Sequence, residues 1–273
     1  AKGYNDIDSA LSDIKNGYFN LPVIVKPVDS SGSKGVSKIE EFNNIEHNLE
    51  NAMAFSRGKR IIVEEFIEKY GYQIAGDGLS VDGELVFRYF ANDHFDSRCK
   101  NPFVPVSASF PYNMPEEIQG KIHNEIQRLL KLLNMGTDLR IDKDFNVYLM
   151  EVAPRDGGNY IPDVIKYATD VDLVECSVKA AMGEKIDYNI KEEKGFYSYF
   201  AVHSIDSGVL ESVDITDEAM KHIVENHIIK KPGDWIDAFT GANTTLGCLI
   251  MKFDNLEQML HMMDCSNEWC SVK

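Results

Sequence analysis

Two acidic residues, Asp138 and Glu151, constrain this chain more than any other feature of its sequence. In the segment DLRIDKDFNVYLME, residues 143–146 can form a four-residue loop, which predicts two antiparallel strands on either side of it. In this register Asp138 lies opposite Glu151, and residues directly opposed across two strands have Cβ atoms about 4.5–5.5 Å apart. Two like charges so close destabilise a hairpin unless something neutralises them. The pair therefore predicts either a bound cation or a solvated face.

Both interpretations have support in the surrounding residues. Mg²⁺ prefers carboxylate oxygens and commonly bridges them to substrate phosphates. Arg140 could instead relieve the repulsion on a solvent-exposed face. The other face of the hairpin is apolar and is expected to pack on the core; it carries Leu139, Ile141, Tyr148, Met150 and Val152. The turn PRDGGN follows directly, and its Arg155 suits bidentate contact with a phosphate or carboxylate beside a metal.

A lysine and a glycine-rich loop stand near the start of the chain. Residues 21–27, LPVIVKP, predict a buried strand that ends with Lys26, and a lysine at such a place needs an anionic partner. Residues 29–36, DSSGSKGV, offer backbone amides, hydroxyls and a second cation, and Gly32 and Gly35 let such a loop close over phosphates. The alternative is an ordinary surface turn. The loop does not match the Walker A pattern GxxxxGK[ST].

Residues 63–67, VEEFI, form a third candidate element. An apolar strand that ends in acids can offer backbone groups to an adenine and a carboxylate to a ribose. The alternative is an edge strand whose glutamates face solvent.

The remaining pattern alternates short strands with helices and predicts an α+β protein. Strands are expected at 60–67, on both sides of Asp82-Gly83 within 72–90, and at 196–203 and 246–253. Helices are expected at 40–55, from Pro115 onward, over most of 160–182, and at 216–226 and 255–263. Residues 91–113, with three prolines, are expected to form a long loop. We expect His203 to be structural and the side chains near His94 and Arg98 to be ordinary loop residues.

Charge and cysteine content exclude some classes of function. The 273 residues include 28 Lys and Arg and 44 Asp and Glu, a formal net charge of −16. Sequence-independent binding of nucleic acid or anionic lipid needs a basic surface, so neither is expected. An odd number of scattered cysteines, five in all, suits a reducing cytoplasm. No apolar run reaches the ~20 residues of a membrane span.

In this order the motifs resemble the ATP-grasp superfamily, in the branch of the carbamoyl-phosphate synthase large subunit, biotin carboxylase and amino-acid ligases. The matching pieces are VIVKPVDSSGSKGV, VEEFI, GYQIAGDGLSVDGELV, the Asp138-Leu139-Arg140 strand and LMEVAPRDGGNYIPDVIKYATDVDL. The resemblance implies two α+β subdomains that clamp ATP, followed by a small α/β domain. We place these parts at 1–68, 69–190 and 191–273.

The resemblance also implies a role for each matching residue. Lys26 resembles the phosphate-binding lysine, and Asp138 and Glu151 resemble the two magnesium ligands. Arg155 resembles the catalytic arginine that steadies the transferring phosphoryl group. The implied ATP-binding residues are Lys26, Ser31, Gly32, Ser33, Lys34, Gly35, Glu64, Glu65, Phe66, Ile67 and Gln73.

The chain departs from the superfamily pattern at several positions. Ala153 stands where many members carry a further metal-binding Asn, and Tyr72-Gln73 stands where many carry a ribose-binding Glu. The chain begins about where the ATP lid begins, so we expect it to lack the preceding domain of roughly 100 residues.

The expected function is an ATP- and Mg²⁺-dependent ligase, with Mn²⁺ as an alternative ion, that joins a small carboxylate to an amine through an acyl phosphate. The alternatives are bicarbonate phosphorylation, as in carbamoyl-phosphate synthase, and an ATP-binding module without turnover. Whether the protein is a homodimer stays open.

Overall fold

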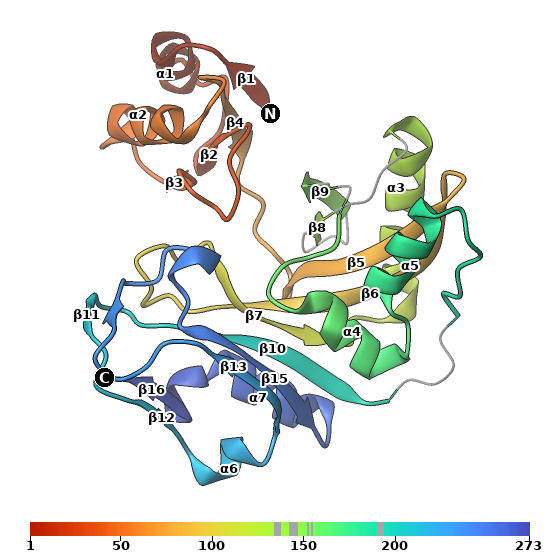
Figure 1. Ribbon diagram of the computed structural model, residues 1–273. Helices are drawn as coiled ribbons and strands as arrows, with labels where there is room; N and C mark the ends of the chain where they lie inside the picture. The colour runs from red at the N-terminus through yellow and green to blue at the C-terminus, as the bar shows by residue number, and fades with distance from the viewer. Residues whose placement is uncertain (134–137, 142–146, 152, 154, 190–193) are drawn as a thin grey trace. The chain divides into compact units, whose positions relative to one another are not determined.

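A computed structural model describes residues 1–273 except 134–137, 142–146, 152, 154 and 190–193 (Figure 1). The chain divides into two compact units. The first contains Ala1–Glu68 with the short segments Lys100–Val104 and Thr240–Asn243, and the second contains the other described residues. Among the described residues, no helix has the length and hydropathy of a membrane span.

The first unit is a four-stranded antiparallel sheet of strand order β1-β4-β2-β3, with two helices on one face. Its strands are β1 (Lys2–Tyr4), β2 (Val23–Pro27), β3 (Ser37–Ile39) and β4 (Ile61–Glu65); its helices are α1 (Ile7–Lys15) and α2 (Ile45–Phe55). Alternation along β2 and β4 turns Val23, Val25, Ile61 and Val63 toward the helices, where they are fully buried. Asp6 caps α1 by accepting a hydrogen bond from the Ser9 amide at 2.7 Å.

The second unit is built on an eight-stranded antiparallel sheet of strand order β13-β15-β10-β7-β6-β5-β8-β9. These strands are β5 (Gln73–Val81), β6 (Glu84–Phe95), β7 (Pro105–Phe110), β8 (Asp138–Ile141), β9 (Val147–Glu151), β10 (Phe196–Val202), β13 (Ile223–Ile228) and β15 (Gly247–Phe253). Two further pairs, β11 (Gly208–Val209) with β14 (Trp235–Ile236) and β12 (Val213–Ile215) with β16 (Cys270–Val272), lie outside it. The large sheet thus takes strands from both of the predicted segments 69–190 and 191–273.

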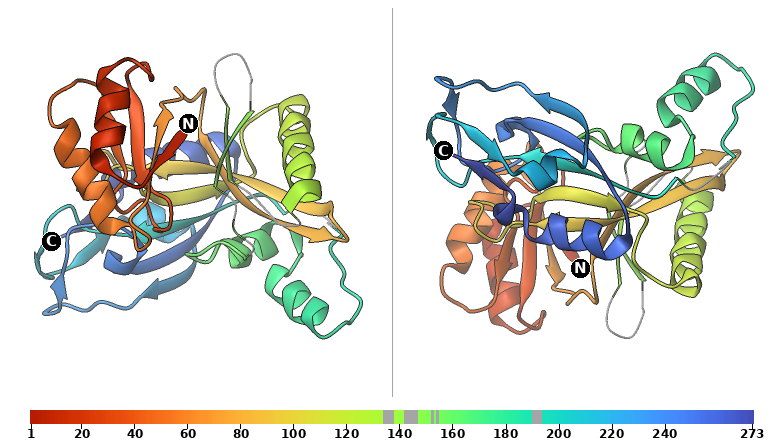
Figure 2. Two further views of the ribbon diagram at one scale, coloured as in Figure 1. Left: turned by 90° about the horizontal axis from the view of Figure 1, so that it is seen from above. Right: turned by 90° about the horizontal axis from the view of Figure 1, so that it is seen from below.

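Helices cover both faces of this sheet. Helix α4 (Ile161–Thr169) packs on the face of Tyr89, Phe110 and Tyr199, and α5 (Leu173–Ala181) follows it. Helix α3 (Glu116–Leu133) packs on the opposite face against Ile74 and Phe90. Figure 2 shows α3 and α4 on opposite sides of β5 and β6. Helix α7 (Leu256–Asp264) lies on the α3 side, where Met263 contacts the hydroxyls of Ser107 and Ser198. A short helix, α6 (Asp217–Met220), precedes β13.

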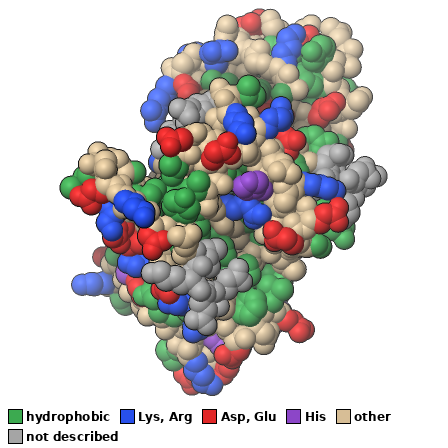
Figure 3. Space-filling model, turned by 90° about the vertical axis from the view of Figure 1, so that its right-hand side faces the viewer, with side chains coloured by type: hydrophobic (Ala, Val, Ile, Leu, Met, Phe, Trp, Pro, Cys, Tyr) green, Lys and Arg blue, Asp and Glu red, His purple; other side chains and the backbone are tan. Residues whose placement is uncertain are grey.

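Charged side chains are interspersed on the surface. On the face drawn in Figure 3, basic and acidic side chains alternate over the described residues. Helix α3 shows how neighbours offset one another, because Lys121 pairs with Glu117 at 3.6 Å and Lys131 pairs with Glu84 at 3.2 Å. Such exposed pairs contribute little to stability, typically about 0–1 kcal/mol.

Two predicted elements were wrong. Nearly half of the expected loop at 91–113 is sheet, because β6 runs on to Phe95 and β7 spans Pro105–Phe110. The strands were not predicted because they contain polar residues, such as Asn92, His94 and Ser109, that are nevertheless buried. The expected helix at 216–226 ends at Met220, and β13 follows because its backbone pairs with β15. Long-range strand pairing overrode the local helical pattern there.

Candidate functional site

Lys26 lies on the face of the first sheet that helices α1 and α2 leave uncovered. The register places Ile24 opposite Glu64 and Lys26 opposite Ile62, so Lys26 and Glu64 share this face. Lys26 Nζ forms an ion pair with Glu64 Oε2 at 2.7 Å, and both side chains are about a quarter exposed, at 22% and 31%. The anionic partner expected for this lysine is therefore a residue predicted to contact the nucleotide.

A second lysine on this face, Lys38, was not predicted from the sequence. Lys38 lies in β3 opposite Ile24, and its Nζ is 4.1 Å from the centre of the Phe66 ring and 2.7 Å from Glu40 Oε1. The clue was the alternation of Ser37-Lys38-Ile39, in which only Ile39 is buried. This face thus carries two lysines within the same short sheet, each paired with a glutamate.

The predicted phosphate loop is anchored at both ends. Asp29 accepts hydrogen bonds from Ser56 Oγ at 2.7 Å and from the amides of Arg57 and Gly58 at 3.1 and 2.6 Å. The bond from Ser56 is the main reason that the pKa of Asp29 lies below its usual value. At the other end Gly35 has φ +76° and lies against Phe55 and Pro27.

Between these anchors the predicted ATP-binding residues differ in exposure. Ser31 and Gly32 are exposed, and Lys34 is half-buried. Ser33 is held in place, because its hydroxyl donates to the Phe103 carbonyl at 3.0 Å and its own carbonyl accepts from Asn101 Nδ2 at 3.0 Å. In the structure, then, the Ser33 hydroxyl is already engaged within the first unit.

The predicted adenine hinge, Glu64 to Ile67, begins in β4 and continues past its end. Glu65 is exposed at the end of the strand, and Phe66 and Ile67 are half-buried. The Phe66 amide donates to the Pro22 carbonyl at 3.0 Å, which ties this segment to the start of β2. Gln73 belongs to the second unit, where its amide donates to Asp93 Oδ2 at 3.0 Å.

The two predicted metal ligands lie opposite each other. The backbone register of β8 and β9 pairs Asp138 with Glu151, as the sequence predicted. From Leu139 onward the register shifts by one residue, so Arg140 pairs with Tyr148. The predicted partner of Val147 at position 142 lies outside the described residues. Aspartate and glutamate are residue types whose oxygens suit Mg²⁺.

The predicted orientation of this hairpin was wrong. Tyr148 and Met150, expected in the core, are 38% and 36% exposed. Val147 packs instead against the cluster formed by Ile74, Phe90 and helix α3. The apolar side chains at 148 and 150 thus face outward.

The glycine-rich turn after β9 carries Arg155. This arginine is exposed, and its Nη1 donates to the backbone oxygen of Asp156 at 2.9 Å. Burial raises the pKa of Asp156, and the nearby Arg155 only partly opposes that rise. Ala153, half-buried, has no side-chain atom that could bind a metal.

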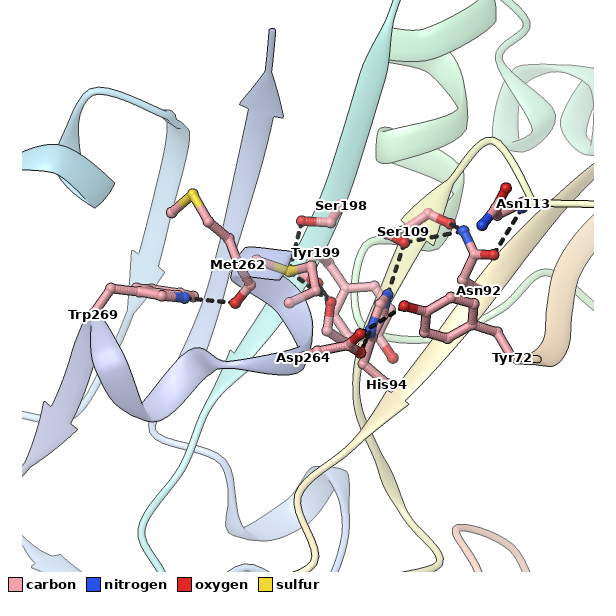
Figure 4. A network of polar contacts seen from close by, with 12 residues as sticks. Tyr72, Asn92, His94, Ser109, Asn113, Ser198, Tyr199, Met262, Asp264 and Trp269 are labelled. Carbon is pink, nitrogen blue, oxygen red and sulfur yellow. Dashed lines mark hydrogen bonds and ion pairs between the residues drawn. The ribbon is translucent and has the colours of Figure 1, made fainter. Parts of the chain in front are cut away.

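Two histidine clusters of the second unit have structural roles. His94 is buried between Ser109 Oγ, 2.8 Å from Nε2, and Asp264 Oδ1, 2.7 Å from Nδ1, and Tyr72 donates to Asp264 Oδ2 at 2.6 Å (Figure 4). The order matches a hydrolytic Ser-His-Asp triad, but Ser109 is fully buried and also accepts from Asn92. No substrate can reach that hydroxyl, so the network fastens α7 to the sheet.

The second cluster joins Asp96, Cys99 and His203, whose ligand atoms lie within 4.8 Å of one another. Arg98 already neutralises Asp96 through Nε at 2.8 Å. Burial alone would raise the pKa of Asp96, but hydrogen bonds from Arg98 and His203 outweigh it and lower the pKa to about 2. The Arg98 guanidinium thus occupies the place of a cation, and His203 has the structural role expected from the sequence.

Comparison with known proteins assigns the chain to a family. The profile of the family described as D-ala D-ala ligase C-terminus matches residues 4–168, more than half of the chain. The chain belongs to this family. Its fold is the α+β ATP-grasp fold, so the resemblance drawn from the motifs is confirmed.

Individual relatives agree with the family. The chain is 30% identical over 174 residues to the D-alanine–D-alanine ligase of Helicobacter acinonychis, a match that covers 58% of this chain and 47% of the relative. It is 26% identical over 169 residues to the carbamoyl phosphate synthase large chain of Thermoanaerobacter pseudethanolicus, covering 61% and 15%. The chain therefore spans less than half the length of these relatives.

A solved structure shows the same fold over most of the chain. The L-amino acid ligase from Bacillus licheniformis has a TM-score of 0.75 and 19% sequence identity, and the match covers 93% of this chain and 64% of that one.

Proposed function

We propose that this protein is part of an ATP- and Mg²⁺-dependent ligase that joins a small carboxylate to an amine through an acyl phosphate. The observation that carries the proposal is the pairing of Asp138 with Glu151, four residues before Arg155, in a chain of the D-ala D-ala ligase family. The acids supply metal ligands and the arginine a cation for the transferring group. The names of the relatives support ligase chemistry.

The predicted ATP-binding residues, together with Lys38, each have a proposed role in binding the nucleotide. Lys26 offsets phosphate charge, and its pairing with Glu64 keeps the ammonium from being buried without a counterion until the nucleotide arrives. Lys38, on the same face, adds positive charge. The loop from Ser31 to Gly35 offers backbone amides to the phosphates, and Glu64 to Ile67 hold the adenosine, with Gln73 as a further nucleotide contact.

Mg²⁺ fits the donor set of Asp138 and Glu151, and when bound it neutralises phosphate charge. The chain's own residues then position the substrates. An oxygen of the carboxylate substrate attacks the γ-phosphorus, the bond to the β-phosphate oxygen breaks, and ADP leaves. Arg155 holds the phosphoryl oxygens through its guanidinium. The amine then attacks the acyl carbon and loses a proton, and the bond to phosphate breaks to release inorganic phosphate.

A second candidate is phosphorylation of bicarbonate. The observation that favours it is the similarity to the carbamoyl phosphate synthase large chain, which covers 61% of this chain. The same residues would serve, with bicarbonate as the carboxylate that attacks ATP.

Phosphate release from ATP tests the proposal. The intact protein is assayed with Mg-ATP against pooled amino acids and, separately, against bicarbonate. Glu151→Gln and Lys26→Ala should each lower turnover by about 10²–10³-fold, the usual effect of removing one preorganised charged contact. Glu117→Gln, on the exposed surface of α3, is the matched control and should leave turnover unchanged.

The outcome separates the candidates. Turnover with amino acids supports the ligase, and turnover with bicarbonate alone supports the second candidate. ATP binding by calorimetry without any phosphate release would instead indicate a binding module. Normal turnover in both site variants would refute the assignment of these residues.

A further inference from the structure

Asp77 is an acidic residue in an apolar row. It lies in the middle of β5, opposite Tyr89 of β6, on the face that helix α4 covers. Its neighbours along the same face of the strand, Ala75 and Leu79, both pack against the apolar cluster under α4. An ionisable group between them loses hydration, and a structure retains such a group only where something compensates for that loss.

The compensation comes from one backbone amide. Both carboxylate oxygens of Asp77 accept a hydrogen bond from the Gly157 amide, Oδ1 at 3.0 Å and Oδ2 at 2.9 Å. Gly157 belongs to the glycine-rich turn after β9, 80 residues further along the chain. Burial raises the pKa of Asp77 to about 6, and the bond from Gly157 opposes that rise only in part; Asp156 adds to the rise, and Arg155 opposes it.

A side chain at Gly157 would be crowded by Ile161 and Asp77. A Cβ atom there would lie 2.8 Å from Ile161 Cδ1 and 3.1 Å from both Ile161 Cβ and Asp77 Oδ1. Around Gly158, by contrast, no atom lies within 4 Å of such a Cβ. The two glycines therefore differ: a Cβ atom at Gly157 would be crowded, and one at Gly158 would have free space.

The rest of the turn is also held. Asn159 and Tyr160 have φ of +55° and +66°, and the Ile161 amide donates to the Gly158 carbonyl at 3.2 Å as α4 begins. The Tyr160 ring stacks on His227 with centroids 4.3 Å apart. Arg155 lies two residues before Gly157. Among the described hydrogen bonds that join this turn to other elements, the bond to Asp77 is the one closest to Arg155 in the sequence.

We propose that Asp77 is a positioning residue, which holds the Gly157 amide and thereby sets where Arg155 presents its guanidinium. The inference rests on the proposed function for the role of Arg155, while the Asp77–Gly157 contact stands independently of it. A misplacement of a reacting group by about 1 Å can cost roughly 10²-fold in rate, so a carboxylate outside the reaction can control turnover.

Two paired comparisons test this inference. Asp77→Asn keeps the shape and removes the charge, and Asp82→Asn, in the exposed turn between β5 and β6, is its control. Gly157→Ala crowds Asp77 and Ile161 at the point where the turn meets β5, and Gly158→Ala is its control. We expect Asp77→Asn and Gly157→Ala to lower the kcat of phosphate release by about 10- to 100-fold with KM for ATP within about threefold, and both controls to match the wild type.

A measurement without ATP or substrate tests the Asp77–Gly157 contact independently of ligase activity. In protein labelled with ¹⁵N-glycine, the Gly157 amide shift should titrate with a midpoint near pH 6 in the wild type, and Asp77→Asn should abolish that titration. This result stands even if the protein shows no ligase activity. A Gly157 shift that is flat from pH 3 to 8, through the ordinary range of an aspartate as well, would overturn the contact.

Wild-type kcat in Asp77→Asn, or equal loss in Gly157→Ala and Gly158→Ala, would overturn the positioning role. If Asp77→Asn fails to fold, the wild-type titration and the two glycine variants still decide the question.

Discussion

Alanine at Gly35 should destabilise the first unit much more than alanine at Gly32, three residues earlier in the same loop. Both glycines have positive φ, +76° and +64°, so either alanine incurs about 1–2 kcal/mol for left-handed backbone. Only Gly35 is also crowded. Its added Cβ would lie 2.9 Å from Phe55 Cβ and 3.1 Å from Pro27 Cγ, whereas nothing lies within 4 Å of a Cβ at Gly32.

The magnitude follows from these contacts. Phe55 Cβ and Pro27 Cγ sit next to the backbone and cannot swing away as the end of a long side chain can. Overpacking of this kind typically costs about 1–3 kcal/mol. Both substitutions restrict the unfolded chain equally, so this effect cancels in the comparison. The unfolding free energy of Gly35→Ala should therefore be about 1–3 kcal/mol below that of Gly32→Ala.

Urea unfolding monitored by circular dichroism measures this difference, and equal slopes for the two variants would show that only stability changed. A Gly35→Ala protein as stable as Gly32→Ala would refute the reasoning. It would mean that the loop moves off Phe55 at no cost.

Two further predictions concern acid stability and metal dependence. Burial lowers the pKa of His94 below its ordinary 6.5, and the bond to Asp264 offsets this only in part. The unfolded chain therefore binds a proton at this histidine more readily than the folded protein does. The free energy of unfolding should thus fall as the pH drops below about 6.5. His94→Gln should show a smaller loss of unfolding free energy between pH 7.5 and 5.5 than the exposed control His261→Gln, and equal losses would contradict the argument. Chelation by EDTA should abolish ATP-dependent phosphate release, and added Mg²⁺ should restore it; release that persists in EDTA would count against Asp138 and Glu151 as metal ligands.

Short-range patterns predicted much of the candidate site. The pairing of Asp138 with Glu151 followed from the position and length of the loop alone, and the structure has it. The strand carrying Lys26 was also predicted, because an apolar run ended by proline is a local signal. Its ion pair with Glu64 was not, because that contact joins strands whose register depends on the whole sheet.

Long-range burial accounts for most of what the sequence did not reveal. Asn92, His94 and Ser109 are polar and yet fully or almost fully inside, because they satisfy one another and Asp264. No local pattern announces such a network. The outward Tyr148 and Met150 are the reverse case, since apolar side chains on a hairpin do not reveal which face the core covers.

The position of β10 inside the large sheet has a consequence for any shortened form of the protein. β10 pairs with β7 on one side and β15 on the other, and six of its seven residues are buried. A chain ended before Phe196 would leave β7 as a bare edge with its backbone groups unpaired. Exposed edges of this kind recruit strands from other molecules. The last third of the sequence thus protects the ATP-grasp sheet from self-association, and a minimal fragment for study should retain it.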